Sequence, residues 1–183
     1  MNRSRRFSGC MVGACLLVVG LFGFPPRAQA EGPAEYQVKA AFLYHFVQFM
    51  TWPPPAQGRA VHVICIIGQD PFGPVLDLSL AGKEIEGKPL TVKRIGAPAD
   101  IDGCEALFVA TSHEVWLRDI QPKIKGKPIL TIAESGEFTA SGGMVGFFLE
   151  GSKVHFEINL DALAQAGLTA SSKLLRLAKI TKP

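Results

Sequence analysis

The polar side chains best placed to bind a small molecule lie in the segment Val154–Asn159, near the carboxyl end of the chain. Apolar and polar residues alternate there, so His155 and Glu157 project from the same side of a predicted strand, with Lys153 at the turn before it. An imidazole, a carboxylate and an ammonium group together can hold a small anionic or zwitterionic ligand. A polar sheet face in contact with water gives the same pattern and remains the alternative.

The sequence presents no recognisable catalytic set. It contains no serine-hydrolase elbow, no phosphate-binding P-loop and no zinc-protease motif. The four histidines lack the spacing typical of metal ligands. The glycine-rich stretch Ser141–Gly146 precedes a predicted strand rather than a helix and lacks the spacing of a dinucleotide-binding loop. We therefore expect no enzymatic activity, no cofactor and no bound metal.

The net charge of +3 comes from the first thirty residues. Four of the 19 basic residues and none of the 16 acidic residues lie there, which leaves the rest of the chain with 15 basic against 16 acidic side chains. A near-neutral domain cannot neutralise many phosphates, so we expect no nucleic-acid partner.

Residues 1–30 have the three parts of a secretory signal peptide. Arginines at the start are followed by the uncharged apolar run Met11–Phe24 and then by Ala28-Gln29-Ala30, a pattern typical of a cleavage site. The run is shorter than the ~20 residues that a membrane span needs. We expect export from the cytoplasm and a single α/β domain over residues 31–183. A lipidated Cys15 is the alternative, but cleavage there would leave an apolar leader on the mature chain.

Export also changes how the cysteines are interpreted, because only Cys65 and Cys104 would remain in the mature chain. In an oxidising compartment a single remaining pair predicts one disulfide. Two buried free thiols are the alternative, since cysteine is also a common core residue.

Residues 35–50 have the spacing of a helix that ends before the Pro53-Pro54-Pro55 run. The stretch 36–52 contains six of the sixteen aromatic residues of the chain, more than one packed face easily buries. We therefore predict that part of this helix contacts a partner protein, and expect Tyr36 and Tyr44 to face outward, opposite a Val38–Phe42–Phe49 stripe. A fully buried core helix is the alternative. The candidate partner-binding residues are Tyr36, Tyr44, Phe46 and Trp52.

Short apolar runs separated by helix-like segments predict a three-layer α/β fold with a mainly parallel sheet. The runs are Val61–Ile67, Ala106–Ala110 and Ile129–Ala133, with a more exposed strand at Leu90–Ile95 and helices at Phe72–Leu80 and His113–Ile120. A C-terminal antiparallel hairpin is expected from Met144–Leu149 and Val154–Asn159, followed by a helix over 160–166 and a last helix from Ser171 or Ser172 to Lys179.

Three segments together resemble the YfiR family of bacterial periplasmic proteins. They are Tyr36–Tyr44 followed by Trp52-Pro53, Gly68 with Asp70–Gly73, and the C-terminal succession Gly142–Phe148, Val154–Asn159 and Ala170–Ala178. The resemblance covers residues 34–180. It implies a three-layer α/β fold, no catalysis, a dimer, and repression of an inner-membrane diguanylate cyclase from the periplasmic side, which lowers cyclic di-GMP and biofilm formation. The positions of Cys65 and Cys104 match a family cysteine pair, whereas a second pair found in some members is missing here.

Two classes of function therefore follow from the sequence. One is a repressor that acts by protein–protein contact on a cyclase with a periplasmic sensor domain. The other is a periplasmic small-molecule-binding protein that serves another membrane receptor, and the two can coexist if a ligand modulates the repressor.

The predicted signal peptide gives the first test. Cleavage after Ala30 leaves Glu31 as the first residue, so N-terminal sequencing of protein taken from the periplasm should begin there. A mature protein that begins with a lipidated Cys15 would contradict this prediction.

Overall fold

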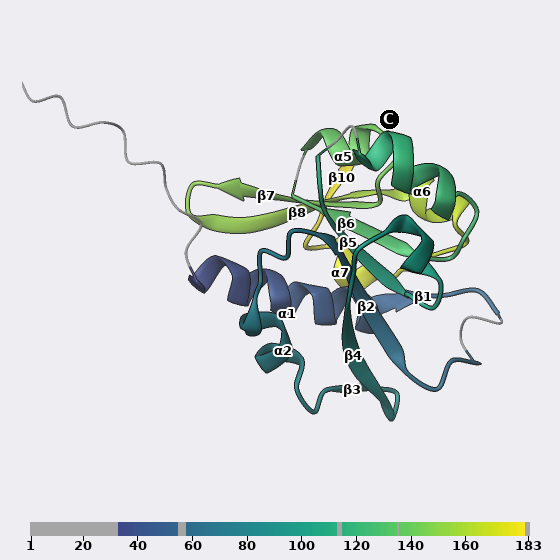
Figure 1. The fold of residues 1–183 in the computed structure, drawn as a ribbon. Helices are drawn as coiled ribbons and strands as arrows, with labels where there is room; N and C mark the ends of the chain where they lie inside the picture. The colour runs from purple at the N-terminus through teal and green to yellow at the C-terminus, as the bar shows by residue number, and fades with distance from the viewer. Residues whose placement is uncertain (1–32, 55–57, 113–114, 135, 182–183) are drawn as a thin grey trace, which may run out of the picture. The chain divides into compact units, whose positions relative to one another are not determined.

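Three central strands with apolar side chains on both faces form the middle of the structure, a computed structural model that describes residues 33–54, 58–112, 115–134 and 136–181 (Figure 1). The predicted signal peptide lies outside these residues. In β2 (His62–Gly68), β5 (Ala106–Ala110) and β6 (Leu130–Ala133) nearly every residue is buried. This is the pattern expected of parallel strands that are covered by helices on both sides.

The described residues form an eight-stranded sheet in the order β10-β8-β7-β6-β5-β2-β4-β3. Neighbouring strands from β4 to β7 are parallel, and β7 and β8 form an antiparallel hairpin. The predicted fold class is thereby confirmed. The other strands of this sheet are β3 (Glu84–Ile85), β4 (Lys88–Ile95), β7 (Val145–Glu150), β8 (Lys153–Asn159) and β10 (Lys179–Thr181).

Helices cover both faces of the sheet and define two apolar cores. Alternate residues of β2 divide between them, since Ile64 and Ile66 join one core and Cys65 and Ile67 the other. The first core contains residues of α1 (Pro33–Phe49), α2 (Pro74–Leu80), α6 (Leu160–Gln165) and α7 (Ser172–Leu175). The second contains residues of the short helices η2 (Pro98–Ile101), η3 (Trp116–Ile120), α4 (Gln121–Ile124) and α5 (Gly136–Ala140).

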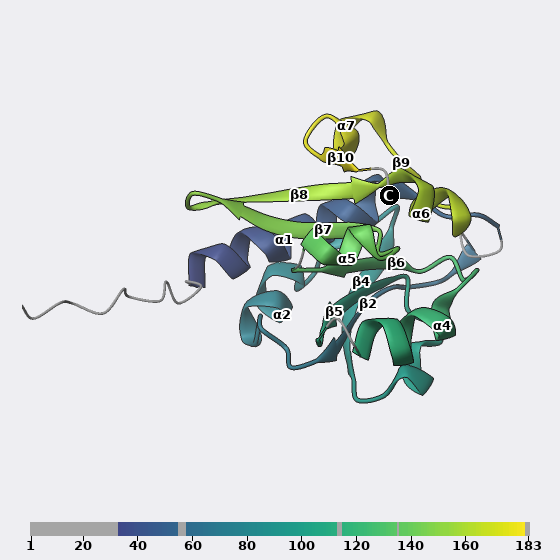
Figure 2. The same cartoon turned by 90° about the horizontal axis from the view of Figure 1, so that it is seen from above.

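The β7–β8 hairpin runs beside α1, as both views show (Figures 1 and 2). Its strands are joined by two residues, because Glu150 pairs with Lys153. Gly151 has a φ of 63°, which suits the first position of a tight hairpin turn and favours glycine there. Phe147 pairs with Phe156 on the side that faces α1, so the hairpin contributes aromatic rings to the first core.

The end of the chain differs from the prediction of one long last helix. Ser171 caps α7 by accepting a hydrogen bond from the Leu174 amide at 3.3 Å, as expected, but the helix ends at Leu175. Residues 179–181 instead form β10, which pairs in parallel with β8. The open edge of β8 offers backbone partners that a further helical turn does not, so tertiary pairing overrides helix propensity.

The sequence also gives no indication of a second, two-stranded sheet. Strand β1 (Met50–Thr51), directly after α1, pairs antiparallel with β9 (Thr169–Ala170), and the Ser171 amide donates to the Phe49 carbonyl at 2.9 Å. Two-residue strands carry no readable periodicity. The consequence is that the end of α1 is fixed by a segment from the far end of the chain.

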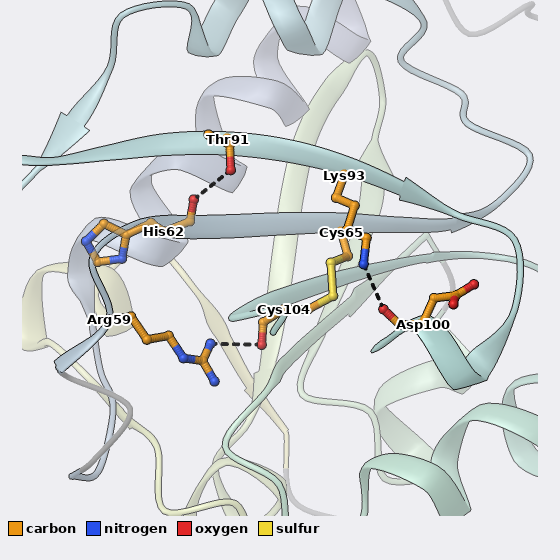
Figure 3. Close-up of a disulfide and its surroundings, with 7 residues drawn as sticks. All are labelled: Arg59, His62, Cys65, Thr91, Lys93, Asp100 and Cys104. Carbon is orange, nitrogen blue, oxygen red and sulfur yellow. Dashed lines mark hydrogen bonds between the residues drawn. A yellow bond between two sulfur atoms is a disulfide. The ribbon is translucent and has the colours of Figure 1, made fainter. Parts of the chain in front are cut away.

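The predicted cysteine pair is joined in the structure. Cys65 on β2 and Cys104, just before β5, form a disulfide whose Cα atoms lie 5.8 Å apart (Figure 3). Both residues are fully buried in the second core. Arg59 donates from Nη1 to the Cys104 carbonyl at 3.1 Å, so the segment before β2 is also held at this point.

Replacing both cysteines by alanine should lower the free energy of unfolding by about 4 kcal/mol, because the bridge closes a loop with a sequence separation of 39. Urea unfolding of the native and variant proteins measures this difference. Thiol labelling of denatured, non-reduced periplasmic protein should find no free thiol, and two reactive thiols would contradict the disulfide.

Candidate functional site

Helix α1 has a buried face and an outer face, and the division is different from the one expected. The residues that face the sheet repeat every three or four positions and are almost completely covered. They are Tyr36, Lys39, Ala40, Leu43, Phe46 and Val47. A second row borders this buried face and is only partly covered, and we call it the outer stripe. It consists of Val38, Phe42, His45 and Phe49.

The expectation that Tyr36 faces outward is wrong, and Phe46 and Trp52 are also buried. Tyr36 is 9% exposed and packs edge-on against Phe72, with ring centroids 5.3 Å apart. Phe46 is fully buried against the β7–β8 hairpin, and Trp52 is 6% exposed. The first core has room for these rings because the hairpin and α2 both pack against α1, which the sequence does not reveal. Of the four candidates only Tyr44 is partly exposed.

The outer stripe is partly accessible, and its two phenylalanines, Phe42 and Phe49, pack at the edge of the first core. Val38 is 43% exposed and His45 is exposed, whereas one side of Phe42 packs against Phe156 at 5.1 Å between centroids. The rings of His45 and Phe49 are stacked with centroids 5.7 Å apart, and Lys173 of α7 lies over the Phe49 ring at 5.8 Å. Rings held in this way present apolar surface without losing much side-chain entropy on binding.

A buried lysine joins the first turns of α1 to the end of β6. The Lys39 side chain is 3% exposed, and its Nζ donates to Glu134 Oε1 at 2.5 Å and contacts Glu35 one turn earlier. Tyr36 donates its hydroxyl to the other oxygen of Glu134 at 3.4 Å. Burial alone lowers the pKa of Lys39, but the hydrogen bonds and charges of Glu134 and Glu35 outweigh it and raise the pKa above its usual value of 10.5.

The polar residues of β8 do not meet in one site. Glu157 is 7% exposed, accepts a hydrogen bond from the Thr139 hydroxyl and lies 3.9 Å from Lys179 Nζ. His155 stacks on Phe148 with centroids 5.6 Å apart, and Lys153 is exposed at the turn. His155 and Glu157 share one face of β8, but Thr139 of α5 and Lys179 of β10, the strand at the edge beside β8, both reach Glu157. A ligand-binding role for Lys153, His155 and Glu157 stays a prediction.

Two kinds of feature are absent from the described residues. Within these residues, no cluster of three or more histidine, cysteine, aspartate or glutamate side chains has an arrangement that could hold a metal ion. Within the same part of the chain, no helix combines the length and apolar character needed to cross a membrane.

A comparison with protein families finds a match over most of the sheet and helix α1. The family described as YfiR/HmsC-like matches residues 36–179, which is most of the chain and all of the sheet up to the first residue of β10. The protein therefore belongs to the YfiR/HmsC-like family, whose members are periplasmic and regulatory rather than catalytic.

Among solved structures, the chain is similar to one described as an ABC domain in complex with L-Trp from Streptococcus pneumonia. The two are 11% identical, with a TM-score of 0.47. The match covers 79% of this chain and 59% of the other, so the chain spans about three fifths of that protein.

The Lys39 network predicts a large effect of a single substitution. Lys39→Met keeps the length of the side chain but leaves Glu35 and Glu134 without their shared cation, and should lower the free energy of unfolding by about 3 kcal/mol in urea. Lys127→Met removes an exposed ion pair with Asp102 and serves as the control, for which little change is expected.

The pH dependence follows from the raised pKa of Lys39. The folded state favours the protonated amine of Lys39. The stabilisation that the charged Lys39 gives to the folded protein is therefore complete below pH 10.5, and it is lost as the pH rises through the higher pKa of the folded state. The stability difference between the native protein and Lys39→Met should therefore narrow only above pH 10.5. A difference that is no larger than that of Lys127→Met at neutral pH would contradict this account.

Proposed function

We propose that this protein acts in the periplasm to hold an inner-membrane diguanylate cyclase inactive by direct contact, which lowers cyclic di-GMP and biofilm formation. The observation that supports the proposal most strongly is the family match over residues 36–179, because the family is regulatory and periplasmic. The cyclase as partner follows from that family resemblance. A homodimer, also implied by the family, remains part of the proposal.

The outer stripe of α1 is the surface that best fits such a contact. It combines an exposed aliphatic side chain, Val38, with the stacked pair His45 and Phe49, and aromatic side chains of this kind concentrate binding energy in interfaces. The helix beneath it is held at both ends, by the Lys39 network at its start and by the β1–β9 pair at its end. A rigid helix face loses little entropy when it binds a partner.

The alternative, a periplasmic binding protein that delivers a small molecule to another membrane receptor, depends on a ligand site. The polar face of β8 gives it limited support, because Glu157 is already engaged with Thr139 and Lys179. The repressor is therefore the first choice.

Deletion of the gene should raise cyclic di-GMP in the host if the cyclase is expressed. A double substitution, Val38→Glu with His45→Glu, should raise it to a similar level, because two carboxylates on the outer stripe would have to be desolvated at the interface. Leu117→Glu, at a residue 40% exposed on the opposite layer, is the matched control and should leave cyclic di-GMP unchanged. Circular dichroism checks that each variant folds.

Unchanged cyclic di-GMP in the deletion strain, with the candidate cyclase shown to be present, would remove the repressor function. A deletion effect without an effect of the double substitution would instead remove the outer stripe as the contact surface. Sedimentation analysis of the double variant adds a separate outcome, since a change from dimer to monomer would identify the outer stripe as the contact between two copies of this chain.

A further inference from the structure

A cavity of about 440 Å³ lies near the amino ends of β6 and β7. Residues of η3 and α4 line one part of it and residues of α6 another, with Thr131 of β6 and Met144, just before β7, completing the wall. Figure 2 shows α4 and α6 at the same end of the molecule. A cavity of this volume falls within the range that binds small molecules in proteins. It is distinct from the outer stripe and from the polar face of β8, because none of those residues lines it.

The wall formed by η3 and α4 contains an irregular helical turn. The Trp116 amide donates to the Ser112 carbonyl and the Lys125 amide to the Gln121 carbonyl, both with ordinary α-helical spacing. Between these bonds the Gln121 amide donates to the Trp116 carbonyl, five residues back. In an α-helix of about 3.6 residues per turn, positions five apart point in different directions, whereas the wider π turn brings them to one side. Trp116 and Gln121 accordingly line the same cavity, and turns of this kind occur frequently at functional sites.

The covered part of the cavity wall is apolar. Ile124 and Met144 are each 7% exposed and Ala166 is 9% exposed, so these side chains retain a little accessible surface. Gln121 is held in place beside them, because its Nε2 donates to the Ser141 carbonyl at 2.6 Å. Apolar surface at this depth favours a ligand with an apolar body, since contact removes both surfaces from water.

The charge at the cavity is a single cation. Lys125 is exposed at its rim and, within the described part of the chain, its amine has no ion-pair or hydrogen-bond partner. Lys123 and Lys127 lie two residues to either side, and Lys127 is paired with Asp102 at 2.6 Å. Among the described residues, no aspartate or glutamate lines the cavity. The cavity therefore suits one negative charge and offers no partner to a positive one.

We propose that this cavity binds a small monoanion with an apolar body, such as an aromatic carboxylic acid. The carboxylate lies at Lys125, and the apolar body packs against Ile124, Met144 and Ala166. The exposed Gln165 amide at the rim provides a further N–H donor to the carboxylate. The site does not depend on the cyclase, so it can be tested without any measurement of cyclic di-GMP.

The test uses four probes that share a phenyl ring and a short chain and differ in charge: anionic 3-phenylpropionate, neutral 3-phenylpropanamide, cationic 3-phenylpropylamine and zwitterionic phenylalanine. Binding is followed at neutral pH in ¹H–¹⁵N spectra of the native protein. The anion at millimolar concentration should shift the backbone amide signals of Lys125 and Gly126 and the side-chain amide signal of Gln165. The neutral amide should bind about fivefold more weakly, and the cation and the zwitterion more weakly still.

Lys125→Met keeps the length of the side chain and removes its charge, so it should weaken binding of 3-phenylpropionate about fivefold and leave binding of the neutral amide unchanged. Lys123→Met, at an exposed lysine of α4 that does not line the cavity, is the matched control and should bind the anion as the native protein does. An equal affinity of native protein and Lys125→Met for the anion would overturn the assigned contact.

Three results would overturn the proposal as a whole. The first is no shift of the Lys125, Gly126 and Gln165 signals with 3-phenylpropionate. The second is an affinity for the neutral, cationic or zwitterionic probe that equals or exceeds the affinity for the anion. The third is binding that perturbs Thr111 and Glu134, which line a separate cavity at the carboxyl ends of the parallel strands, while the signals of Lys125 and Gly126 stay unchanged.

Discussion

Burial of β2, β5 and β6 on both faces is the constraint on which the rest of the structure depends. Strands without a polar face need a cover on each side, and the chain supplies α1, α2 and α7 on one side and η3, α4 and α5 on the other. Because these strands are parallel, their carboxyl ends meet at the same edge of the sheet. Residues that are far apart in sequence, such as Thr111 and Glu134, thus line one cavity.

The same constraint explains why so much of the fold can be predicted from the sequence. Continuous apolar runs identify β2, β5 and β6, and alternation in 154–159 identifies β8 and its partner in the hairpin. These signals are local and arise from burial, so they can be recognised without knowing which strands and helices pack against each strand. The strand β10 and the β1–β9 pair were missed because their conformation is imposed by a neighbouring strand rather than by their own residues.

The candidate sites were less predictable, for a reason that α1 illustrates. Helical spacing alone allows either the Val38–Phe42–Phe49 row or the Tyr36–Phe46 row to be the buried one, since both are apolar. In the structure the Tyr36–Phe46 row is the buried one, and Lys39 lies between Glu35 and Glu134 on the same side, where Tyr36 also donates to Glu134. The Glu35–Lys39 spacing is visible in the sequence, but the approach of Glu134 depends on the order of strands and cannot be read from the chain.

The β1–β9 pair has a consequence for the order of folding. Met50 can pair with Ala170, and the Phe49 carbonyl can accept a hydrogen bond from the Ser171 amide, only after residues 169–171 have reached their place beside β1. Contacts between positions so distant in sequence form slowly, because the loop between them must first be closed. A chain that lacks its final fifteen residues therefore has no partner for β1, and the end of the first helix then relies on its core packing alone.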